Sequence, residues 1–172
     1  MKRGKVVLKL GDDVSTDIIY PGRFMATVLP AETPRYAFAD HPTFHRQLEA
    51  KEIPAGSIVL AGSNFGCGSS REQAASCLKG YELTVIARGF ARIFLQNAIN
   101  LGLDMVICPT LEAEEGDELE MREGALVHVR SGKSFPIVPL PRARQAIIDA
   151  GGLIPYTRRL LAERVATHPA GS

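Results

Sequence analysis

Short apolar runs alternate with amphipathic segments along the first two thirds of the chain. The runs are rich in β-branched residues and bounded by glycine or proline, which predicts buried strands at residues 5–10, 57–60, 83–87 and 104–109. Helical patterns lie between the later runs, at 73–79 and 91–101, and each is followed by a glycine. Another helix is predicted at 43–51, with Phe44 and Leu48 on one face. Strands that alternate with helices in this way favour βαβ units and a largely parallel sheet.

The spacing changes after Gly116. Short runs joined by glycine-containing turns predict antiparallel hairpins that form a second sheet layer, at residues 118–122, 126–130 and 133–138. A helix is predicted from Pro141 to Ala150 and a terminal helix at 154–165, whereas residues 166–172 are expected to be a frayed tail. No internal repeat or linker divides the sequence, so we expect a single α/β domain over residues 1–172.

Two segments near the N-terminus lack a clear period. Residues 14–27 predict a loop, a short extended piece and a second loop. Residues 30–42 contain three prolines and few periodic apolar positions, which predicts a surface excursion with only short helical turns.

Composition narrows the class of protein. The 172 residues can bury one hydrophobic core, and 20 Lys and Arg against 19 Asp and Glu give no reason to expect nucleic acid or an acidic membrane surface as a partner. No segment could span a bilayer, and the N-terminal apolar run is too short for a signal peptide. Cys67, Cys77 and Cys108 form no CxxC pair, which argues against a disulfide framework and a self-contained zinc or iron–sulfur site. We therefore expect a cytoplasmic protein with no metal site of its own.

The strongest chemical signal is a glycine-punctuated loop at residues 61–73, which follows the predicted strand 57–60 and runs into a helix. Its glycines permit positive φ and close approach of the backbone to a ligand (Gly62, Gly66 and Gly68). Ser69 and Ser70 are expected at the start of the helix, where either could cap it. The helix N-terminus and the planar fork of Arg71 favour a carboxylate or a phosphate.

Two common phosphate-binding patterns are absent from this loop. It lacks the Gly-Lys-Ser/Thr ending of a P-loop, and the spacing of its glycines does not fit the dinucleotide fingerprint. Taken alone, a Ser-Ser-x-Glu sequence would only cap a helix.

A longer resemblance goes beyond that structural explanation. Residues 62–72, Gly-Ser-Asn-Phe-Gly-Cys-Gly-Ser-Ser-Arg-Glu, resemble the signature of the small subunits of 3-isopropylmalate dehydratases, the mobile-domain half of the aconitase family. The similarity continues at 85–94 and 97–103, and residues 11–19 resemble the Gly-Asp-x-x-x-Thr-Asp element of that family. It extends to about Pro109. The resemblance implies the swivelling β/β/α three-layer domain of the aconitase C-terminal type.

The resemblance also implies roles for individual residues. The serine at position 69 would act as an alkoxide base that removes a carbon-bound proton, and Arg71 would bind a substrate carboxylate. Local positive charge and N–H donors are what such an alkoxide requires. Ser70 matches a further hydroxyl that contacts substrate, and Asp17 matches a member of the polar network around the site. From the residues alone, Asp17 could equally form an Asx turn.

The cofactor of the family is a [4Fe–4S] cluster that acts as a Lewis acid on the leaving hydroxyl. The resemblance places its three cysteine ligands on a separate large subunit, so this chain is expected to bind no cofactor. Cys67, Cys77 and Cys108 are then loop and core cysteines. Cys67 lies in the active loop, and its sensitivity to oxidation is a hypothesis.

The loop after the Thr-Asp element bears on substrate choice. In homoaconitases it carries a Tyr-Leu-Arg-like stretch whose arginine meets a distal carboxylate, whereas isopropylmalate enzymes have apolar residues there. This chain has Phe24, Met25 and Ala26, with Ala26 at the position of the arginine. An apolar loop receives a branched alkyl group better than a charged one. Arg23 stands close by and complicates this interpretation.

The resemblance therefore implies a hydro-lyase subunit that interconverts 2- and 3-isopropylmalate in leucine biosynthesis, together with a large subunit as heterodimer or heterotetramer. A homoaconitase or a 2,3-dimethylmalate or citraconate-type hydro-lyase would use much the same loop. A stand-alone anion-binding regulatory module is the alternative without catalysis. The sequence also leaves open a homo-oligomer of the isolated chain.

Overall fold

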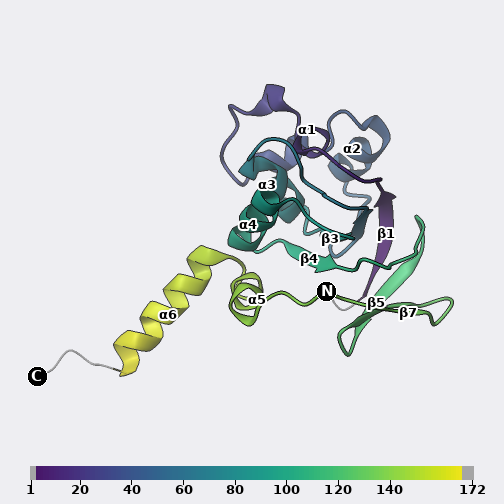
Figure 1. Cartoon of the computed structure of the whole chain (residues 1–172). Coiled ribbons are helices and arrows are strands. Elements are labelled where there is room, and N and C mark those ends of the chain that lie inside the picture. The colour runs from purple at the N-terminus through teal and green to yellow at the C-terminus, as the bar shows by residue number, and fades with distance from the viewer. Residues whose placement is uncertain (1–2, 168–172) are drawn as a thin grey trace, which may run out of the picture.

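Seven strands form one continuous sheet in the order β4-β3-β2-β1-β5-β6-β7 (Figure 1). The computed structural model describes residues 3–167. Its strands are β1 (Arg3–Lys9), β2 (Ile58–Ala61), β3 (Thr84–Ala87), β4 (Asp104–Ile107), β5 (Glu118–Arg122), β6 (Ala125–His128) and β7 (Ser134–Pro136). Its helices are α1 (Thr16–Ile19), α2 (Pro42–Glu49), α3 (Glu72–Gly80), α4 (Arg92–Leu101), α5 (Arg142–Asp149) and α6 (Leu153–Thr167), with the 3-10 turns η1 (Gly22–Phe24) and η2 (Thr33–Tyr36).

The strands β1 to β4 form the parallel half of the sheet. β1 pairs with β2, β2 with β3 and β3 with β4, so that Val59, Val85 and Met105 lie in one row. Every residue of β2 and β3 is buried, because apolar clusters lie on both faces of these strands. The predicted βαβ architecture is therefore confirmed.

The strands β5, β6 and β7 extend the same sheet on the other side of β1. β5 pairs antiparallel with β1, and β6 and β7 follow in antiparallel hairpins. After β7 the chain reaches the far edge of the sheet, where the N–H of Val138 donates to the carbonyl of Ile107 at 2.8 Å. The sheet thus curves back on itself. The second sheet layer expected from the hairpins exists, and it is continuous with the first.

Two apolar clusters separate the layers. The inner cluster lies between the hairpins and the parallel strands and includes Val6, Ile58, Leu60, Ile86, Val106, Leu119, Leu126 and Phe135. The outer cluster lies between the parallel strands and the helices and includes Phe44, Val59, Ala61, Phe65, Leu78, Val85 and Phe94. Successive residues of β2 alternate between the two clusters, as the side chains of a strand do. This is the β/β/α arrangement that the resemblance implied.

A helix replaces the extended piece expected within residues 14–27. α1 begins after Ser15, whose Oγ accepts a hydrogen bond from the N–H of Asp17 at 3.2 Å. Ile19 and Tyr20 at its end are fully buried. A capped turn satisfies the backbone beside these buried side chains. The predicted extended piece was wrong, because an apolar run this short carries no period that separates a helix from a strand.

The segment at 30–42 is more buried than the predicted surface excursion. Thr33, Ala37 and Phe38 have no exposed surface. The hydroxyl of Thr33 forms a 2.8 Å hydrogen bond with that of Ser76 in α3, and the ring of Phe38 packs edge-on against Phe44 of α2. Single side chains inserted between prolines anchor the segment, and such insertions leave no periodic pattern in the sequence.

The predicted helices are present with small shifts at their ends, and Gly102 ends α4 with φ 70°. Ile93 of that helix is 53% exposed despite its apolar side chain. α6 projects from the body of the molecule (Figure 1) and is exposed over nearly its whole length. Ala166 and Thr167 continue α6 instead of fraying, and the rest of the expected tail lies outside the described residues.

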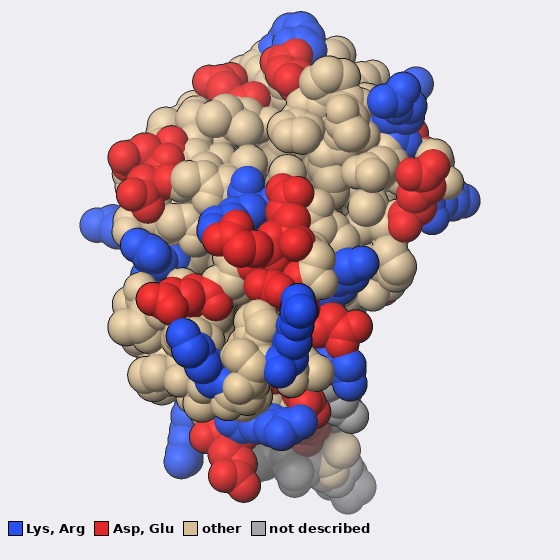
Figure 2. All heavy atoms as spheres, turned by 90° about the vertical axis from the view of Figure 1, so that its right-hand side faces the viewer, with Lys and Arg blue, Asp and Glu red and all other residues tan. Residues whose placement is uncertain are grey.

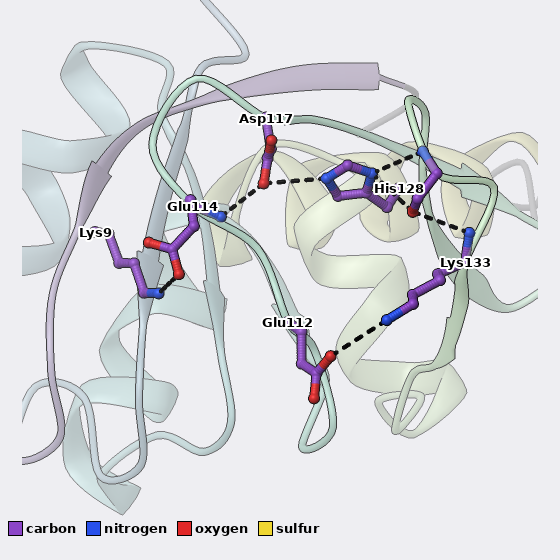
Figure 3. A network of polar contacts seen from close by, with 7 residues as sticks. Lys9, Glu112, Glu114, Asp117, His128 and Lys133 are labelled. Carbon is purple, nitrogen blue, oxygen red and sulfur yellow. Dashed lines mark hydrogen bonds and ion pairs between the residues drawn. The ribbon is translucent and has the colours of Figure 1, made fainter.

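Charged side chains hold the connection between β4 and β5 in place (Figure 3). The ion pairs are Lys9–Glu114 and Glu112–Lys133, and Nε2 of His128 lies 3.0 Å from Oδ2 of Asp117. Hydrogen bonds from the Glu114 N–H and from His128 hold the pKa of Asp117 below its usual range.

On the face shown in Figure 2, acidic residues gather near the centre and basic residues are interspersed around them. None of the described helices combines the length and apolar composition that crossing a bilayer requires.

Replacing Gly66 by alanine should destabilise the fold strongly. Gly66 is buried with φ 82°, and an added Cβ would lie 2.2 Å from Cγ of Phe94. Backbone strain and the clash together should lower the free energy of unfolding by about 3 kcal/mol or more. Gly116 also has a positive φ, but no atom lies within 4 Å of its added Cβ. Gly116→Ala should therefore show the effect of backbone strain alone and lower the free energy of unfolding by about 1 kcal/mol. Urea unfolding measures both variants, and equal losses would contradict the role of the Phe94 contact.

Candidate active site

Three loops meet where the parallel strands end, at the edge of the sheet where open α/β folds bind ligands. The loop after β1 contacts the loop after β2 through a hydrogen bond from the Gly62 N–H to the Gly11 carbonyl, at 3.0 Å. The loop after β3 joins from the other side, where the Arg88 N–H donates to the Gly62 carbonyl at 3.1 Å. The glycine loop at 62–71 therefore lies between its two neighbours.

The two motifs that carry the family resemblance lie side by side. Oδ1 of Asp12 accepts a hydrogen bond from the N–H of Ser63 at 2.6 Å. The N–H of Thr16 donates to the carbonyl of Cys67 at 2.8 Å, near the other end of the loop. An added Cβ at Gly62 would lie only 1.9 Å from Oδ1 of Asp12, so this contact requires glycine. Segment 11–16 thus fixes the path of the glycine loop.

Ser69 and Ser70 do not cap α3, contrary to the sequence-based prediction. The helix begins at Glu72, its N-cap residue is Arg71, and no side chain makes a capping hydrogen bond there. Both serines are exposed, and neither hydroxyl bonds to another described residue. Because these hydroxyls take no part in capping, they and the helix N-terminus are available to a ligand.

The carbonyl groups of the two serines are held from opposite elements. The hydroxyl of Thr16, a buried residue, donates to the carbonyl of Ser69 at 3.2 Å. Nδ2 of Asn97 in α4 donates to the carbonyl of Ser70 at 3.2 Å. These bonds orient the peptide units on both sides of Ser70 and fix where the serine side chains start. Sequence reasoning assigned no role to Thr16 or Asn97, although both lie within segments that resemble the family.

The side chain of Arg71 is mostly buried, with only 14% of it exposed. Its Nη1 donates to Oδ1 of Asp17 and, at 3.2 Å, to the carbonyl of Tyr20. Its Nε is buried without a hydrogen-bond partner, and Nη2 makes no hydrogen bond to any described residue. One arm of the guanidinium is therefore anchored in the protein, and the other can donate to a carboxylate.

Asp17 anchors that arginine from the exposed side. Its Oδ1 also accepts a hydrogen bond from the N–H of Gly22 at 3.1 Å. The hydrogen bond from Arg71 is the main cause that holds the pKa of Asp17 below its usual range, with the attraction of the guanidinium charge adding to it. Asp17 therefore stays ionised at neutral pH. The structure brings together Ser69, Ser70, Arg71 and Asp17.

The predicted substrate loop runs beside the start of α3. Nε2 of Gln73 donates to the carbonyl of Met25 at 3.3 Å. Met25 is 51% exposed and Ala26 is exposed as well. The ring of Phe24 stacks on Tyr36 with centroids 4.2 Å apart, so Phe24 is half-buried and offers less free surface than its neighbours. Met25 and Ala26 are the apolar groups of this loop that a ligand can reach.

The residues at 3–167 do not fit a metal cluster. No group of three or more His, Cys, Asp or Glu side chains that could hold a metal occurs in the described part of the chain. Cys77 belongs to the outer core and Cys108 to the inner core, and burial raises the pKa of both thiols. A raised pKa disfavours the thiolate that would ligate iron. Cys67 alone is partly exposed.

Known proteins resemble the chain over nearly its whole length. Residues 30–107 match the model of the aconitase C-terminal domain. The 3-isopropylmalate dehydratase small subunit of Methanosarcina acetivorans is 45% identical over 161 residues, which cover 91% of this chain and 96% of that protein. The Aquifex aeolicus protein of the same name is 43% identical over 169 residues, with 94% and 97% covered. A Methanocaldococcus jannaschii protein named isopropylmalate/citramalate isomerase small subunit is 39% identical, with 91% and 94% covered.

The fold agrees with these sequence matches. The crystal structure of a 3-isopropylmalate dehydratase from Methanocaldococcus jannaschii aligns with a TM-score of 0.81 at 37% identity, covering 94% of this chain and 97% of that one. Sequence identity and fold thus agree over the same length. The chain belongs to the family of 3-isopropylmalate dehydratase small subunits, within the aconitase family.

Proposed function

We propose that the chain is the small subunit of a hydro-lyase that interconverts 2-isopropylmalate and 3-isopropylmalate in leucine biosynthesis. The observation that carries the proposal is that exposed serine hydroxyls stand next to an arginine that can still bind a ligand. The hydroxyls of Ser69 and Ser70 form no hydrogen bond with a described residue, and Nη2 of Arg71 has no partner among the described residues. The names of the relatives point to the same reaction. The described chain would act as one swivelling domain.

Arg71 and the start of α3 would bind a substrate carboxylate. Nη2 of Arg71 and the backbone N–H groups at the helix N-terminus offer donors to the carboxylate oxygens. Ser70 would add a hydroxyl to the same group. Asp17 would keep the guanidinium in place and would not touch the carboxylate, because like charges repel.

Ser69 would move the proton. Its Oγ, as an alkoxide, would take a proton from a substrate carbon as a hydroxide leaves the neighbouring carbon, which forms a carbon–carbon double bond. On rehydration with the opposite orientation, the serine would return the proton to the other carbon. Arg71 and the N–H groups lower the cost of the alkoxide by their positive charge.

The apolar loop would receive the isopropyl group of the substrate. Met25 and Ala26 are exposed beside the carboxylate site, and Phe24 would contribute its edge. A buried alkyl group is favoured by such a surface, whereas a carboxylate there would lose its hydration without a partner.

A large subunit would complete the active site. The described residues do not fit a [4Fe–4S] cluster, and the resemblance assigns that cluster to the large subunit, in a heterodimer or heterotetramer. We also place the protein in the cytoplasm, because its three cysteines are all free, as in a reducing compartment.

Mixing the chain with a cluster-loaded large subunit should give turnover of isopropylmalate. Homocitrate should react at least about tenfold more slowly by kcat/KM, because its distal carboxylate would meet an apolar loop. Dimethylmalate has a small apolar substituent and should fall between the two. Initial rates with the three substrates measure this order. A preference for homocitrate would identify a homoaconitase, and no turnover of any substrate would refute the enzymatic function.

Replacing Ser69 by alanine should reduce kcat by about a thousandfold or more, because the proton has no other acceptor at that position. Ser63→Ala is the matched control, since Ser63 is an exposed serine of the same loop and its hydroxyl has no role in the proposed site. Steady-state kinetics of the assembled enzyme and analytical ultracentrifugation test both variants. Retained turnover in an intact Ser69→Ala complex would rule out Ser69 as the base.

A further inference from the structure

A bidentate ion pair lies next to the apolar substrate loop. Nη1 of Arg23 donates to Oδ2 of Asp40 at 2.9 Å, and Nη2 donates to Oδ1 at 2.5 Å. Both side chains are more than half exposed. The hydrogen bonds from Arg23 hold the pKa of Asp40 below its usual range, so the carboxylate stays charged and balances the guanidinium. The pair joins η1 to the segment that follows η2.

The same guanidinium covers the ring of Phe24. Cζ of Arg23 lies 4.6 Å from the centre of that ring, and Tyr36 stacks on the ring at 4.2 Å. The ring is therefore packed against both the guanidinium of Arg23 and the ring of Tyr36. Asp40 accepts hydrogen bonds from both Nη atoms of Arg23, and the guanidinium of Arg23 in turn covers the ring of Phe24. The contacts that hold the Phe24 ring therefore also hold the guanidinium of Arg23.

Arg23 also stands close to the proposed carboxylate site. The preceding residue, Gly22, contacts Asp17 through its N–H, and a Cβ added to Gly22 would lie 3.0 Å from Nη2 of Arg71. A substrate carboxylate bound at Arg71 would thus lie beside Gly22, where the substrate loop with Arg23 and Phe24 begins. A free guanidinium at this place would attract a second carboxylate on the substrate.

We propose that Asp40 is a positioning residue for substrate choice, which by pairing with Arg23 keeps the alkyl side of the site uncharged and so excludes substrates with a distal carboxylate. The proposal deepens the proposed function and rests on it. The pair is not needed for stability, because an exposed ion pair contributes little to the free energy of folding. Loss of Asp40 should therefore change selectivity more than folding.

The test replaces Asp40 by asparagine in the assembled two-subunit enzyme. Asparagine keeps the shape of the side chain and removes its charge, so Arg23 is no longer neutralised. The ratio of kcat/KM for homocitrate to that for isopropylmalate should rise about tenfold. Removing the cation as well, in Asp40→Asn/Arg23→Ala, should return this ratio to the wild-type value.

A matched control is available on the hairpin side of the sheet. Arg122 of β5 binds Glu120 through Nε and Nη2, with side chains 60% and 28% exposed, so Glu120→Gln removes a surface pair of the same kind away from the Ser69 loop. It should leave the ratio unchanged. An unchanged ratio in Asp40→Asn, with both kcat/KM values falling together, would overturn the proposal. Absence of turnover in the wild-type complex would instead refute the proposed function.

Discussion

The backbone contact between segment 11–16 and the glycine loop is the constraint on which the site depends. Hydrogen bonds from Gly62 to Gly11, from Gly66 to Val14 and from Thr16 to Cys67 join two segments that are far apart in the sequence. Glycine is required because a side chain at position 62 or 66 would overlap Asp12 or Phe94. The parallel strands bring both segments to one edge, and their contact then brings Arg71 and the two serines before it next to Asp17.

The hydrogen bonds that hold Arg71 in place prepare it to bind a substrate carboxylate. A guanidinium held by Asp17 and the Tyr20 carbonyl loses little conformational entropy when it binds a carboxylate, because it is already ordered. The same anchor reaches the substrate loop through Gly22, so the carboxylate site and the alkyl site share one support. If a partner subunit supplies the other catalytic groups, the residues on this chain must already be held in their working positions.

Local and periodic signals predicted much of this molecule. The parallel strands, the main helices and the hairpins follow from apolar runs, stop glycines and turns, and the motif placed Ser69 and Arg71 at a helix start. Two features depend on tertiary contacts and had no local signal. Single side chains such as Phe38 bury the segment at 30–42, and Arg71, which is anchored by Asp17, takes the N-cap position predicted for a serine. The cap of α1 by Ser15 is local, but the apolar run that follows it is too short to indicate a helix. The pairing of Arg23 with Asp40 likewise joins residues that no periodic pattern relates.

In the proposed enzyme, this chain supplies one half of the active site and a partner chain supplies the other. A competition experiment tests this division, with the large subunit limiting and the Ser69→Ala chain added in increasing amounts to the wild-type chain. Turnover should fall to about half when the two forms are equal in concentration, because the variant occupies the large subunit without catalysing the reaction. Turnover that does not respond to the variant would show that the active site is not divided between the two chains.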